Sequence, residues 1–272
     1  MFSLNAKLKD ELQDSYSIEE GIPCFSPKSE TEKAQDKYES VTDNIDFYTW
    51  LAFSGVHAQN EAKSVYSRIK DILLRELKIN PTPLTILDVG CGVGRTLYDA
   101  STFYDNSQFI GFDYSANMLL RAKQILLDDR VLQIDLSSSG LAPFELTGRN
   151  QTNVHLVQGD AMDLPFKPDS VDAVINTFLI DRVKDVRLAL EQMVAVLKPG
   201  GLFVLTSPLN FQTTDNWKYG NPETLLQLLK ELGIETLISE DNILHTEVLD
   251  DRGNSKVWNT LMIWGRKTSV FS

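Results

Sequence analysis

Glycines alternate with other residues in the stretch LDVGCGVGR, where Gly90, Gly92 and Gly94 follow an apolar run that carries Asp88. Glycine lets the backbone approach a ligand closely because it has no Cβ, and free amides at the start of a helix favour polar or negative groups. The dinucleotide fingerprint G-x-G-x-x-G needs a sixth-position glycine, and Arg95 stands there. The stretch therefore predicts a nucleotide-type loop for which a pyrophosphate is the less favoured ligand.

Two further acidic residues follow apolar runs. Asp113 ends the run FIGFD, 23 residues after Gly90, where an acid accepts hydrogen bonds from ribose hydroxyls and repels a 2′-phosphate. Asp160 follows NVHLVQG, where it can reach an adenine amino group, and a short loop comes after it. Because the carboxyl ends of parallel strands meet at one edge of an open α/β sheet, we predict that the three loops surround one nucleoside.

The elements that must position these loops alternate between short apolar runs and helical patterns. Such alternation implies right-handed crossovers, so we predict an α/β fold with a Rossmann-like, doubly wound, mainly parallel sheet. The apolar spacing from Ala58 to Leu77 predicts an amphipathic helix. The runs near 242–249 and 256–264, joined by 250–254, predict a C-terminal hairpin that adds an antiparallel edge. The other predicted strands are LTILDVG, QFIGFD, NVHLVQGD, VDAVINT and GLFVLTS, and the other predicted helices begin near Gly94, span about Ser115 to Leu127, carry Val186 to Leu197, and include LLQLLKELG.

Composition divides the chain into an appendage and a domain. Residues 1–55 lack clean alternation and contain Gly21, Pro23 and Pro27, which predicts an N-terminal cap or lid. Residues 56–272 form the main domain. Within it, residues 129–152 are long and rich in polar and small residues, which is typical of a surface insertion.

Charge and cysteine content limit the functional classes. The chain has 272 residues and a net charge of -12, which disfavours a nucleic-acid partner. It shows neither an apolar signal core nor a run long enough for a membrane span, and it has two cysteines, so we expect a reduced, cytoplasmic protein. Its three histidines are scattered, so we expect no metal site. We expect a monomer or a homodimer.

From about Thr85 to Pro208 the sequence resembles the class I S-adenosylmethionine-dependent methyltransferases. The resemblance rests on five motifs in order: LDVGCGVGR, GFDYSANML, GDAMDLPF, VDAVINT and LKPGGLFVLTSP. Two shorter stretches resemble narrower groups. SYSIEEGIPCF is similar to an entry segment of some small-molecule methyltransferases, and NTFLIDRVKDVRLAL with SPLNFQTTDNW is similar to the methyltransferase part of ovothiol synthases.

The resemblance implies S-adenosylmethionine as the cofactor and assigns residues to its parts. The glycine loop with Asp88 surrounds the methionyl group, Asp113 takes the ribose, Met118 packs near the adenine, and the segment from Asp160 reads the base. Asn176 and Thr177 lie beside the methionyl group and the acceptor. The full implied set is Asp88, Gly90, Cys91, Gly92, Gly94, Asp113, Tyr114, Met118, Asp160, Ala161, Met162, Asn176 and Thr177.

Catalytic residues are harder to identify because methyl transfer depends largely on alignment, and a base is needed only for a protonated acceptor. Asp181 and Arg182 can orient or deprotonate an acceptor, or they cap and charge the following helix. His57 is a candidate base. His155 is interpreted as a packed strand residue and His245 as a structural residue of the hairpin.

Aromatic residues in two segments are candidates for the acceptor pocket. One group precedes the first long helix, where it can form a lid, with ordinary packing as the alternative. The other follows the fifth strand, with support of the hairpin as its alternative. The candidates are Tyr48, Trp50, Phe53, Trp217 and Tyr219.

These features predict transfer of a methyl group to a nitrogen, oxygen or sulfur atom of a small molecule. A second hypothesis is a module that binds the cofactor or its demethylated product without turnover. A third is an NAD-dependent oxidoreductase, which shares the sheet but needs a glycine where Arg95 stands.

Overall fold

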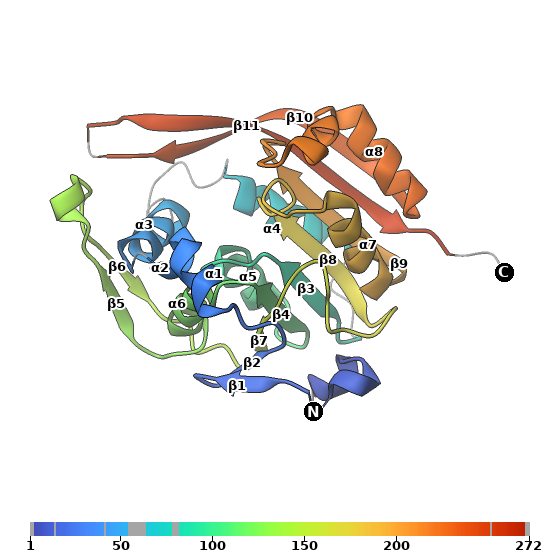
Figure 1. The fold of residues 1–272 in the computed structure, drawn as a ribbon, viewed down its shortest axis with the longest axis horizontal. Coiled ribbons are helices and arrows are strands. Elements are labelled where there is room, and N and C mark those ends of the chain that lie inside the picture. Colours follow the sequence, from blue (N-terminus) through green and yellow to red (C-terminus); the bar gives the residue numbers. More distant parts are fainter. Residues whose placement is uncertain are drawn as a thin grey trace.

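The computed structural model describes residues 3–13, 15–40, 42–53, 64–77, 82–250 and 252–269. Within them a sheet of nine strands has the order β1-β2-β7-β4-β3-β8-β9-β11-β10 (Figure 1). The strands of this sheet are β1 (Ser17–Glu19), β2 (Ile22–Cys24), β3 (Thr85–Val89), β4 (Gln108–Asp113), β7 (Val154–Gln158), β8 (Val171–Thr177), β9 (Leu197–Ser207), β10 (Ile234–Val248) and β11 (Ser255–Lys267). The strands from β2 to β9 run parallel, which confirms the predicted Rossmann-like sheet.

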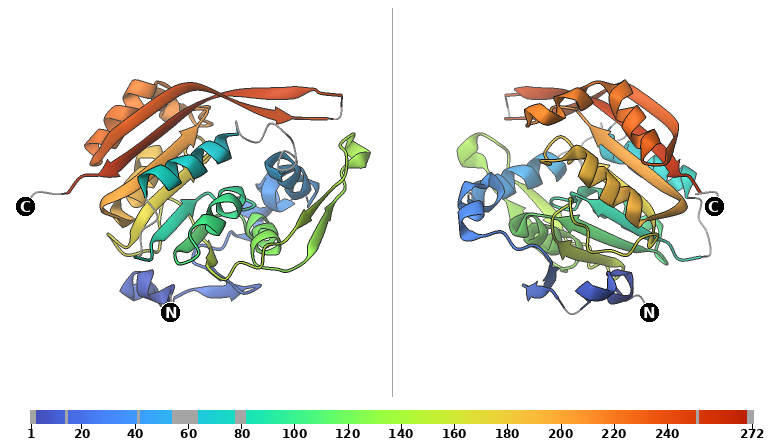
Figure 2. Two further views of the ribbon diagram at one scale, coloured as in Figure 1. Left: turned by 180° about the vertical axis from the view of Figure 1, so that it is seen from behind. Right: turned by 45° about the vertical axis from the view of Figure 1, so that its right-hand side comes forward.

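Helices cover both faces of this sheet (Figure 2). Alternating apolar side chains of the strands give each face its own hydrophobic core. On one face lie α4 (Val65–Glu76), α5 (Arg95–Ala100) and α6 (Ala116–Leu126), and on the other lie α7 (Val186–Val196) and α8 (Pro222–Glu231). Local capping explains several helix starts: Ser64, Ser115, Asp185 and Asn221 each accept a backbone hydrogen bond at the first turn.

The predicted C-terminal hairpin is confirmed, although β10 is longer than the sequence indicated. It begins at Ile234 because residues up to Glu240 already pair with β11, and an irregularity between Glu240 and Ile243 separates this part from the predicted run. β11 pairs antiparallel with β9 only through Leu261–Arg266. Beyond that point β10 and β11 continue as a two-stranded arm, residues 243–248 and 255–260, past the rest of the sheet (Figures 1 and 2).

The first fifty residues contribute to two different parts of the fold. β2 joins the sheet beside β7 through the pair Cys24 and Gln158. The helices α2 (Lys37–Ser40) and α3 (Thr42–Phe53) then pack against α6, and α1 (Glu30–Gln35) packs against α2. The stretch 129–152 contains a separate hairpin of β5 (Val131–Ile134) and β6 (Phe144–Thr147).

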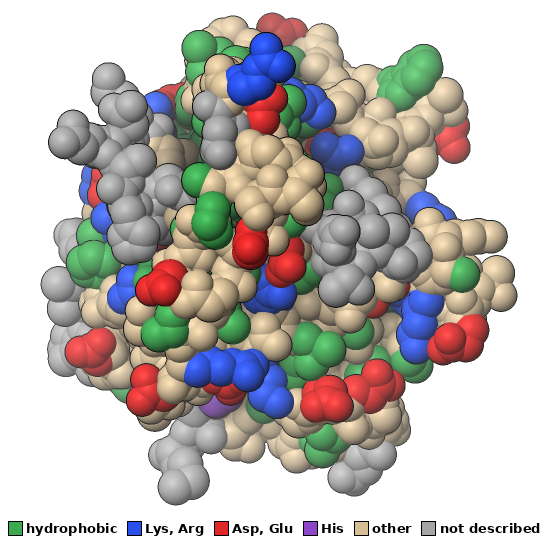
Figure 3. All heavy atoms as spheres, turned by 90° about the vertical axis from the view of Figure 1, so that its left-hand side faces the viewer, with side chains coloured by type: hydrophobic (Ala, Val, Ile, Leu, Met, Phe, Trp, Pro, Cys, Tyr) green, Lys and Arg blue, Asp and Glu red, His purple; other side chains and the backbone are tan. Residues whose placement is uncertain are grey.

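The tips of the arm and of the β5–β6 hairpin lie on the same side of the molecule, where acidic and basic side chains are interspersed (Figure 3). Among the described residues, no helix has the length and apolar character that a bilayer crossing requires.

Candidate functional site

The glycine loop leaves β3 and turns back at the carboxyl edge of the sheet. The amides of Gly90 and Cys91 donate to the Phe112 carbonyl at 2.7 and 3.1 Å, which ties the loop to β4. A Cβ on Gly90 would lie 2.8 Å from Leu179, and one on Gly94 would lie 2.7 Å from Leu126, so the fold itself requires these two glycines.

Gly92 differs from the other two loop glycines. Its φ is +52°, and a Cβ there would meet nothing within 4 Å among the described atoms. The positive φ favours glycine at this position, whereas packing against the described atoms does not require it. The open space beside it leaves room for a ligand to approach the backbone of the loop.

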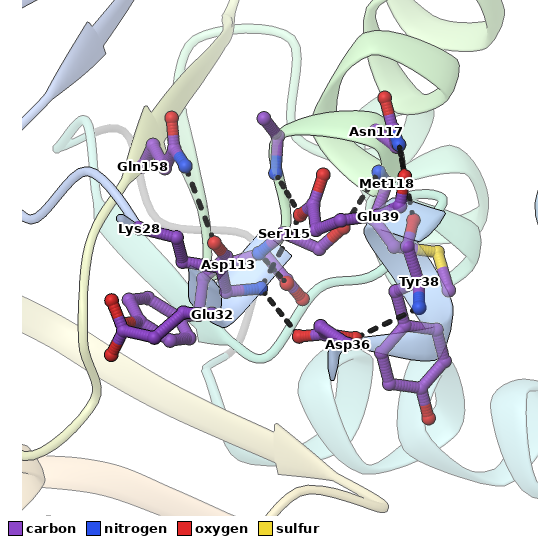
Figure 4. A network of polar contacts seen from close by, with 12 residues as sticks. Lys28, Glu32, Asp36, Tyr38, Glu39, Asp113, Ser115, Asn117, Met118 and Gln158 are labelled. Atoms are coloured by element: carbon purple, nitrogen blue, oxygen red, sulfur yellow. Dashed lines mark hydrogen bonds and ion pairs between the residues drawn. The ribbon is translucent and has the colours of Figure 1, made fainter. Parts of the chain in front are cut away.

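Asp113 connects the glycine loop with the end of β4. Its carboxylate accepts hydrogen bonds from the Gly92 amide at 2.8 Å and from the Ser115 amide at 2.9 Å (Figure 4). Burial raises the pKa of Asp113, while these backbone hydrogen bonds and the charge of Lys28 act in the opposite direction. Two of the predicted ligand loops thus meet at one carboxylate.

Asp88, near the carboxyl end of β3, is a buried carboxyl group in an unfavourable electrostatic environment. Its side chain is buried, with 1% of the residue exposed, and neither carboxylate oxygen has a hydrogen-bond partner in the part of the chain that the structure describes. Burial, and then the nearby Asp113, raises its pKa to about 8. A buried carboxyl without partners is costly, so this one marks a place for a polar or cationic ligand group.

Further unpaired oxygens lie on β8 and β9, the two strands that follow β3 in the sheet order. Asn176 is the register partner of Val89, and Thr177 is the register partner of Thr206 on β9. Asn176 Oδ1, Thr177 Oγ1 and Thr206 Oγ1 are buried without a hydrogen-bond partner among the described residues. Together with Asp88 they place unused polar atoms on three adjacent strand ends, where the sequence predicted a methionyl group.

The predicted adenine side lies at the ends of β4 and β7. Asp160 Oδ1 accepts from the Met162 amide at 2.9 Å, which closes the short loop that contains the buried Ala161. Met118 is buried in the first turn of α6, and the Tyr114 carbonyl accepts from Gln158 at 3.3 Å. The structure therefore gathers all three predicted cofactor loops at one edge.

An ion-pair cluster from the N-terminal segment covers this side. The Lys28 ammonium lies 4.3 Å from the centre of the Tyr114 ring and pairs with Asp36 at 2.7 Å and Glu39 at 3.3 Å. Glu39 also accepts from the Ala116 amide at 2.9 Å, at the start of α6 (Figure 4). This cluster could not be predicted from the sequence because its members come together only when the segment folds over the sheet.

The catalytic candidates Asp181 and Arg182 follow β8. Asp181 is buried, accepts from Ser207 Oγ at 3.3 Å and pairs with Arg182 at 3.4 Å. Burial raises the pKa of Asp181, and Arg182 opposes this. Asp185, and not Asp181, caps α7, which removes the capping alternative for Asp181. The third candidate, His57, lies outside the described residues.

The five aromatic candidates do not come together. Tyr48 contacts Tyr38 with a hydroxyl distance of 3.3 Å, and Trp50 donates to the Ala142 carbonyl at 3.3 Å in the core of the β5–β6 hairpin. Phe53 is fully buried against Tyr98. Trp217 is 64% exposed, and Tyr219 is buried in the core against Phe211.

Of these five, Tyr48 is the one that the structure connects to the site. Its partner Tyr38 feels the charges of both Asp113 and Arg182, and burial followed by the hydrogen bond with Tyr48 raises the pKa of Tyr38.

Sequence reasoning missed the role of Arg95. Its guanidinium is buried, donates to the Ala52 carbonyl at 2.5 Å and pairs with Asp99 at 3.0 Å. It also lies over the rings of Phe53 and Tyr66 at 5.4 and 5.3 Å. Arg95 therefore joins the end of α3 to α4 and α5. A charged residue directly after a glycine loop was the one available hint.

A second missed group is aromatic. The ring centre of His245, in the arm, lies 5.0 Å from that of Phe178 and 6.2 Å from that of Tyr66. Phe178 is the residue that follows Thr177. Phe178 has a φ of +59°, which is rare for a bulky side chain. Such strained backbone conformations cluster at active sites and ligand-binding sites. By contrast, His155 lies within the sheet, with its Nε2 2.8 Å from Gln108 Oε1.

The arrangement of a parallel sheet, an antiparallel C-terminal hairpin and a glycine loop at the carboxyl edge defines a Rossmann-like α/β fold. Residues 87–205 match the family model described as a methyltransferase domain. With the observed fold, this match makes the segment similar to methyltransferase domains.

Curated relatives carry related names. The demethylmenaquinone methyltransferase of Desulfitobacterium hafniense (strain Y51) is 27% identical over 190 residues, which cover 70% of this chain and 64% of that protein. That of Staphylococcus carnosus (strain TM300) is 43% identical over 74 residues, which cover 27% of this chain and 31% of that protein. The chain thus spans less than two thirds of the length of these relatives.

Solved structures share the fold at low identity. Phosphoethanolamine N-methyltransferase 2 of Haemonchus contortus, in complex with S-adenosyl-L-methionine, has a TM-score of 0.58 and 17% identity over 89% of this chain and 61% of that chain. The cyclase SpnF has a TM-score of 0.55 and 16% identity over 86% of this chain and 97% of that chain. Because one fold carries both names, the reaction has to be argued from the site.

Proposed function

We propose that the protein transfers a methyl group from S-adenosylmethionine to a nitrogen, oxygen or sulfur atom of a small molecule. The observation that carries this proposal is the buried, unpaired carboxyl of Asp88 beside the open space at Gly92. A ligand with a cationic amino group and a sulfonium supplies the positively charged partner that this carboxyl lacks.

The residues at the edge fit the parts of this cofactor. Asp88 and the loop at Gly92 would hold the methionyl end, Asp113 would accept the ribose hydroxyls, and the turn at Asp160 with Met118 would receive the adenine. When bound, the cofactor supplies a methyl group activated by a positive sulfur. The chain's own contribution is to align an acceptor with that methyl group and to exclude water.

On the acceptor side, Asp181 and Arg182 would orient the acceptor, with His57 kept as a candidate base. Demethylmenaquinone, which names the curated relatives, is a further small molecule to test, and a product from it would place the methyl group on a ring carbon and so fall outside the nitrogen, oxygen or sulfur acceptors of this proposal. We also propose that residues 1–55 act as a cap and that residues 56–272 form the catalytic domain, because the Lys28 cluster closes the adenine side and Arg95 holds the end of α3.

Calorimetry with S-adenosylmethionine and S-adenosylhomocysteine tests the cofactor assignment. Loss of a charged acceptor in Asp113→Ala should weaken binding by at least ~1.5 kcal/mol, or about tenfold. Asp105→Ala is the control, since Asp105 is exposed and lies in the turn before β4, at the opposite end of that strand from Asp113. Binding by neither ligand, or equal affinity in Asp113→Ala, would overturn the assignment.

Turnover is a separate measurement. S-adenosylhomocysteine should form when the protein is given the cofactor and a panel of amines, phenols, thiols and detergent-dispersed demethylmenaquinone. Binding without product across the whole panel would favour the module that binds without turnover.

A further inference from the structure

The arm of β10 and β11 has two unlike faces. Residues paired across the two strands share a face, so Leu244 and Asn259 lie on one side while His245 and Trp258 lie on the other. Leu244 and Val257 are 65% and 54% exposed, whereas Ile243, on the same face as His245, is buried. The face with His245 is therefore turned toward the protein.

His245 meets two rings from other elements. Phe178, at the end of β8, lies 5.0 Å away, and Tyr66, in the first turn of α4, lies 6.2 Å away. The Phe178 and Tyr66 rings are themselves 6.5 Å apart and nearly perpendicular. Three elements distant in sequence thus each contribute one aromatic side chain to a single cluster. We call this group the ring cluster (Tyr66, Phe178 and His245).

The ring cluster borders the unpaired polar atoms of the edge. Phe178 directly follows Thr177, whose hydroxyl is buried without a hydrogen-bond partner among the described residues, as is that of Thr206 opposite it. Arg95, the residue that directly follows the glycine loop, lies over the Tyr66 ring at 5.3 Å. The cluster therefore lies on the side of the proposed methionyl site that points away from Asp113 and the adenine loops.

The two arginines nearest the ring cluster are each paired within the chain. Arg95 lies over Tyr66 and pairs with Asp99, and Arg182, after β8, pairs with Asp181. With these cations already paired, the flat rings favour an uncharged, planar molecule over a charged aliphatic one.

His245 can act as a proton acceptor at neutral pH. Burial lowers its pKa, and Glu247 on the same strand opposes this shift. From the neighbouring elements, Tyr66 faces the imidazole from α4. The charges of Arg95, Asp99, Asp88 and Glu247 reach Tyr66, and burial raises its pKa to about 12. A neutral imidazole beside a protonated phenol is suited to accepting a proton from a ligand.

We propose that the ring cluster is the acceptor subsite, that it takes an uncharged planar molecule with an ionisable O–H or N–H, and that His245 accepts the proton of that group. The inference rests on the proposed methyl transfer. In the reaction, the lone pair of the acceptor atom forms the bond to the methyl carbon, the carbon–sulfur bond breaks with its electrons going to sulfur, and the acceptor proton moves to His245, which later releases it to water.

Histidine NMR can test the subsite without turnover, because the chain has only three histidines. The full-length protein is labelled at histidine Cε1 and saturated with S-adenosylhomocysteine, and His245→Gln identifies the signal of His245. The probe 1-naphthol should shift this signal and leave that of His155 in place. Ethanolamine at equal concentration should shift neither.

A comparison of two probes tests the proton-accepting role. 1-Methoxynaphthalene has the same ring system but no O–H, so it should bind wild type at least tenfold more weakly than 1-naphthol. In His245→Gln the two probes should differ by less than threefold, whereas the control His155→Gln should keep the wild-type ratio. Phe178→Leu should weaken both probes alike, because it removes ring contact and leaves the imidazole.

The outcomes separate this inference from the proposed function. If S-adenosylhomocysteine binds but 1-naphthol leaves the His245 signal unmoved up to its solubility limit, the subsite is wrong and the cofactor assignment stands. An unchanged probe ratio in His245→Gln would overturn the role of the imidazole. If S-adenosylhomocysteine itself does not bind, the proposed function fails and this inference fails with it.

Discussion

The Asp88→Asn variant should lose much less stability than the wild-type protein as pH rises toward 8. Burial raises the pKa of Asp88 from 3.8 to about 8. The unfolded chain therefore loses this proton near pH 4, whereas the folded protein keeps it to near pH 8. Between these values the folded state binds more protons, so the free energy of unfolding falls as pH rises.

The size of the effect follows from the two pKa values. Linkage over the interval from pH 5 to pH 8 gives a loss on the order of 4 kcal/mol for the wild-type protein. This is a large share of the ~5–15 kcal/mol that stabilises a typical domain. An asparagine amide does not titrate, so Asp88→Asn should lose less stability by about that amount over the same interval.

Urea unfolding of the ligand-free protein at pH 5 and pH 8 measures the difference. Any fixed cost of the buried amide cancels, because each variant is compared with itself at the two pH values. Asp163→Asn, at an exposed site, should follow the wild type. Parallel losses in wild type and Asp88→Asn would refute the reasoning that Asp88 stays protonated when buried without a partner.

Four other substitutions separate residues that bind ligand from residues that hold the fold. Gly92→Ala should cost about 1–2 kcal/mol for its positive φ but weaken S-adenosylhomocysteine at least tenfold, because its Cβ enters the open space of the loop. Gly94→Ala should destabilise the fold more strongly, since its Cβ meets Leu126 at 2.7 Å. Trp50→Phe should lower stability by about 1–2 kcal/mol through the lost hydrogen bond to Ala142 and leave cofactor affinity unchanged. Arg95→Lys should cost about 1–3 kcal/mol, because lysine cannot bond the Ala52 carbonyl and Asp99 with one planar group.

Chemical denaturation and calorimetry on each variant check these expectations. Unchanged cofactor affinity in Gly92→Ala would show that the open space is not the ligand's. A rise in the dissociation constant for Trp50→Phe would place that ring nearer the ligand than its packing against β5 and β6 indicates. Full stability in Arg95→Lys would mean that α3 is held by other contacts.

The central part of the fold could be predicted from the sequence because its causes are local. Short apolar runs specify β3, β4, β7, β8 and β9, and Ser115 caps α6 within its own turn. The cofactor loops were predictable for the same reason, since parallel strands bring their carboxyl ends together whatever the details of packing.

What could not be predicted depends on contacts between distant segments. β2 has three residues and joins the sheet through Cys24 and Gln158, which nothing near Cys24 indicates. Trp50 and Phe53 lie on one apolar helix, and only the folded chain shows that they face protein core. His245 was interpreted as structural because a hairpin pattern says nothing of what its inner face meets, and the structure places it against Phe178.

The pairing of β2 with β7 has a practical consequence for work with shortened chains. The Phe25 amide also donates to the Gln158 carbonyl at 2.9 Å, so the N-terminal segment occupies outer hydrogen-bonding groups at the carboxyl end of β7. A shortened chain that starts after Phe25, for instance to simplify expression, would leave β7 as an exposed edge strand. Exposed edge strands pair with strands of other molecules, and we expect the shortened protein to self-associate and precipitate.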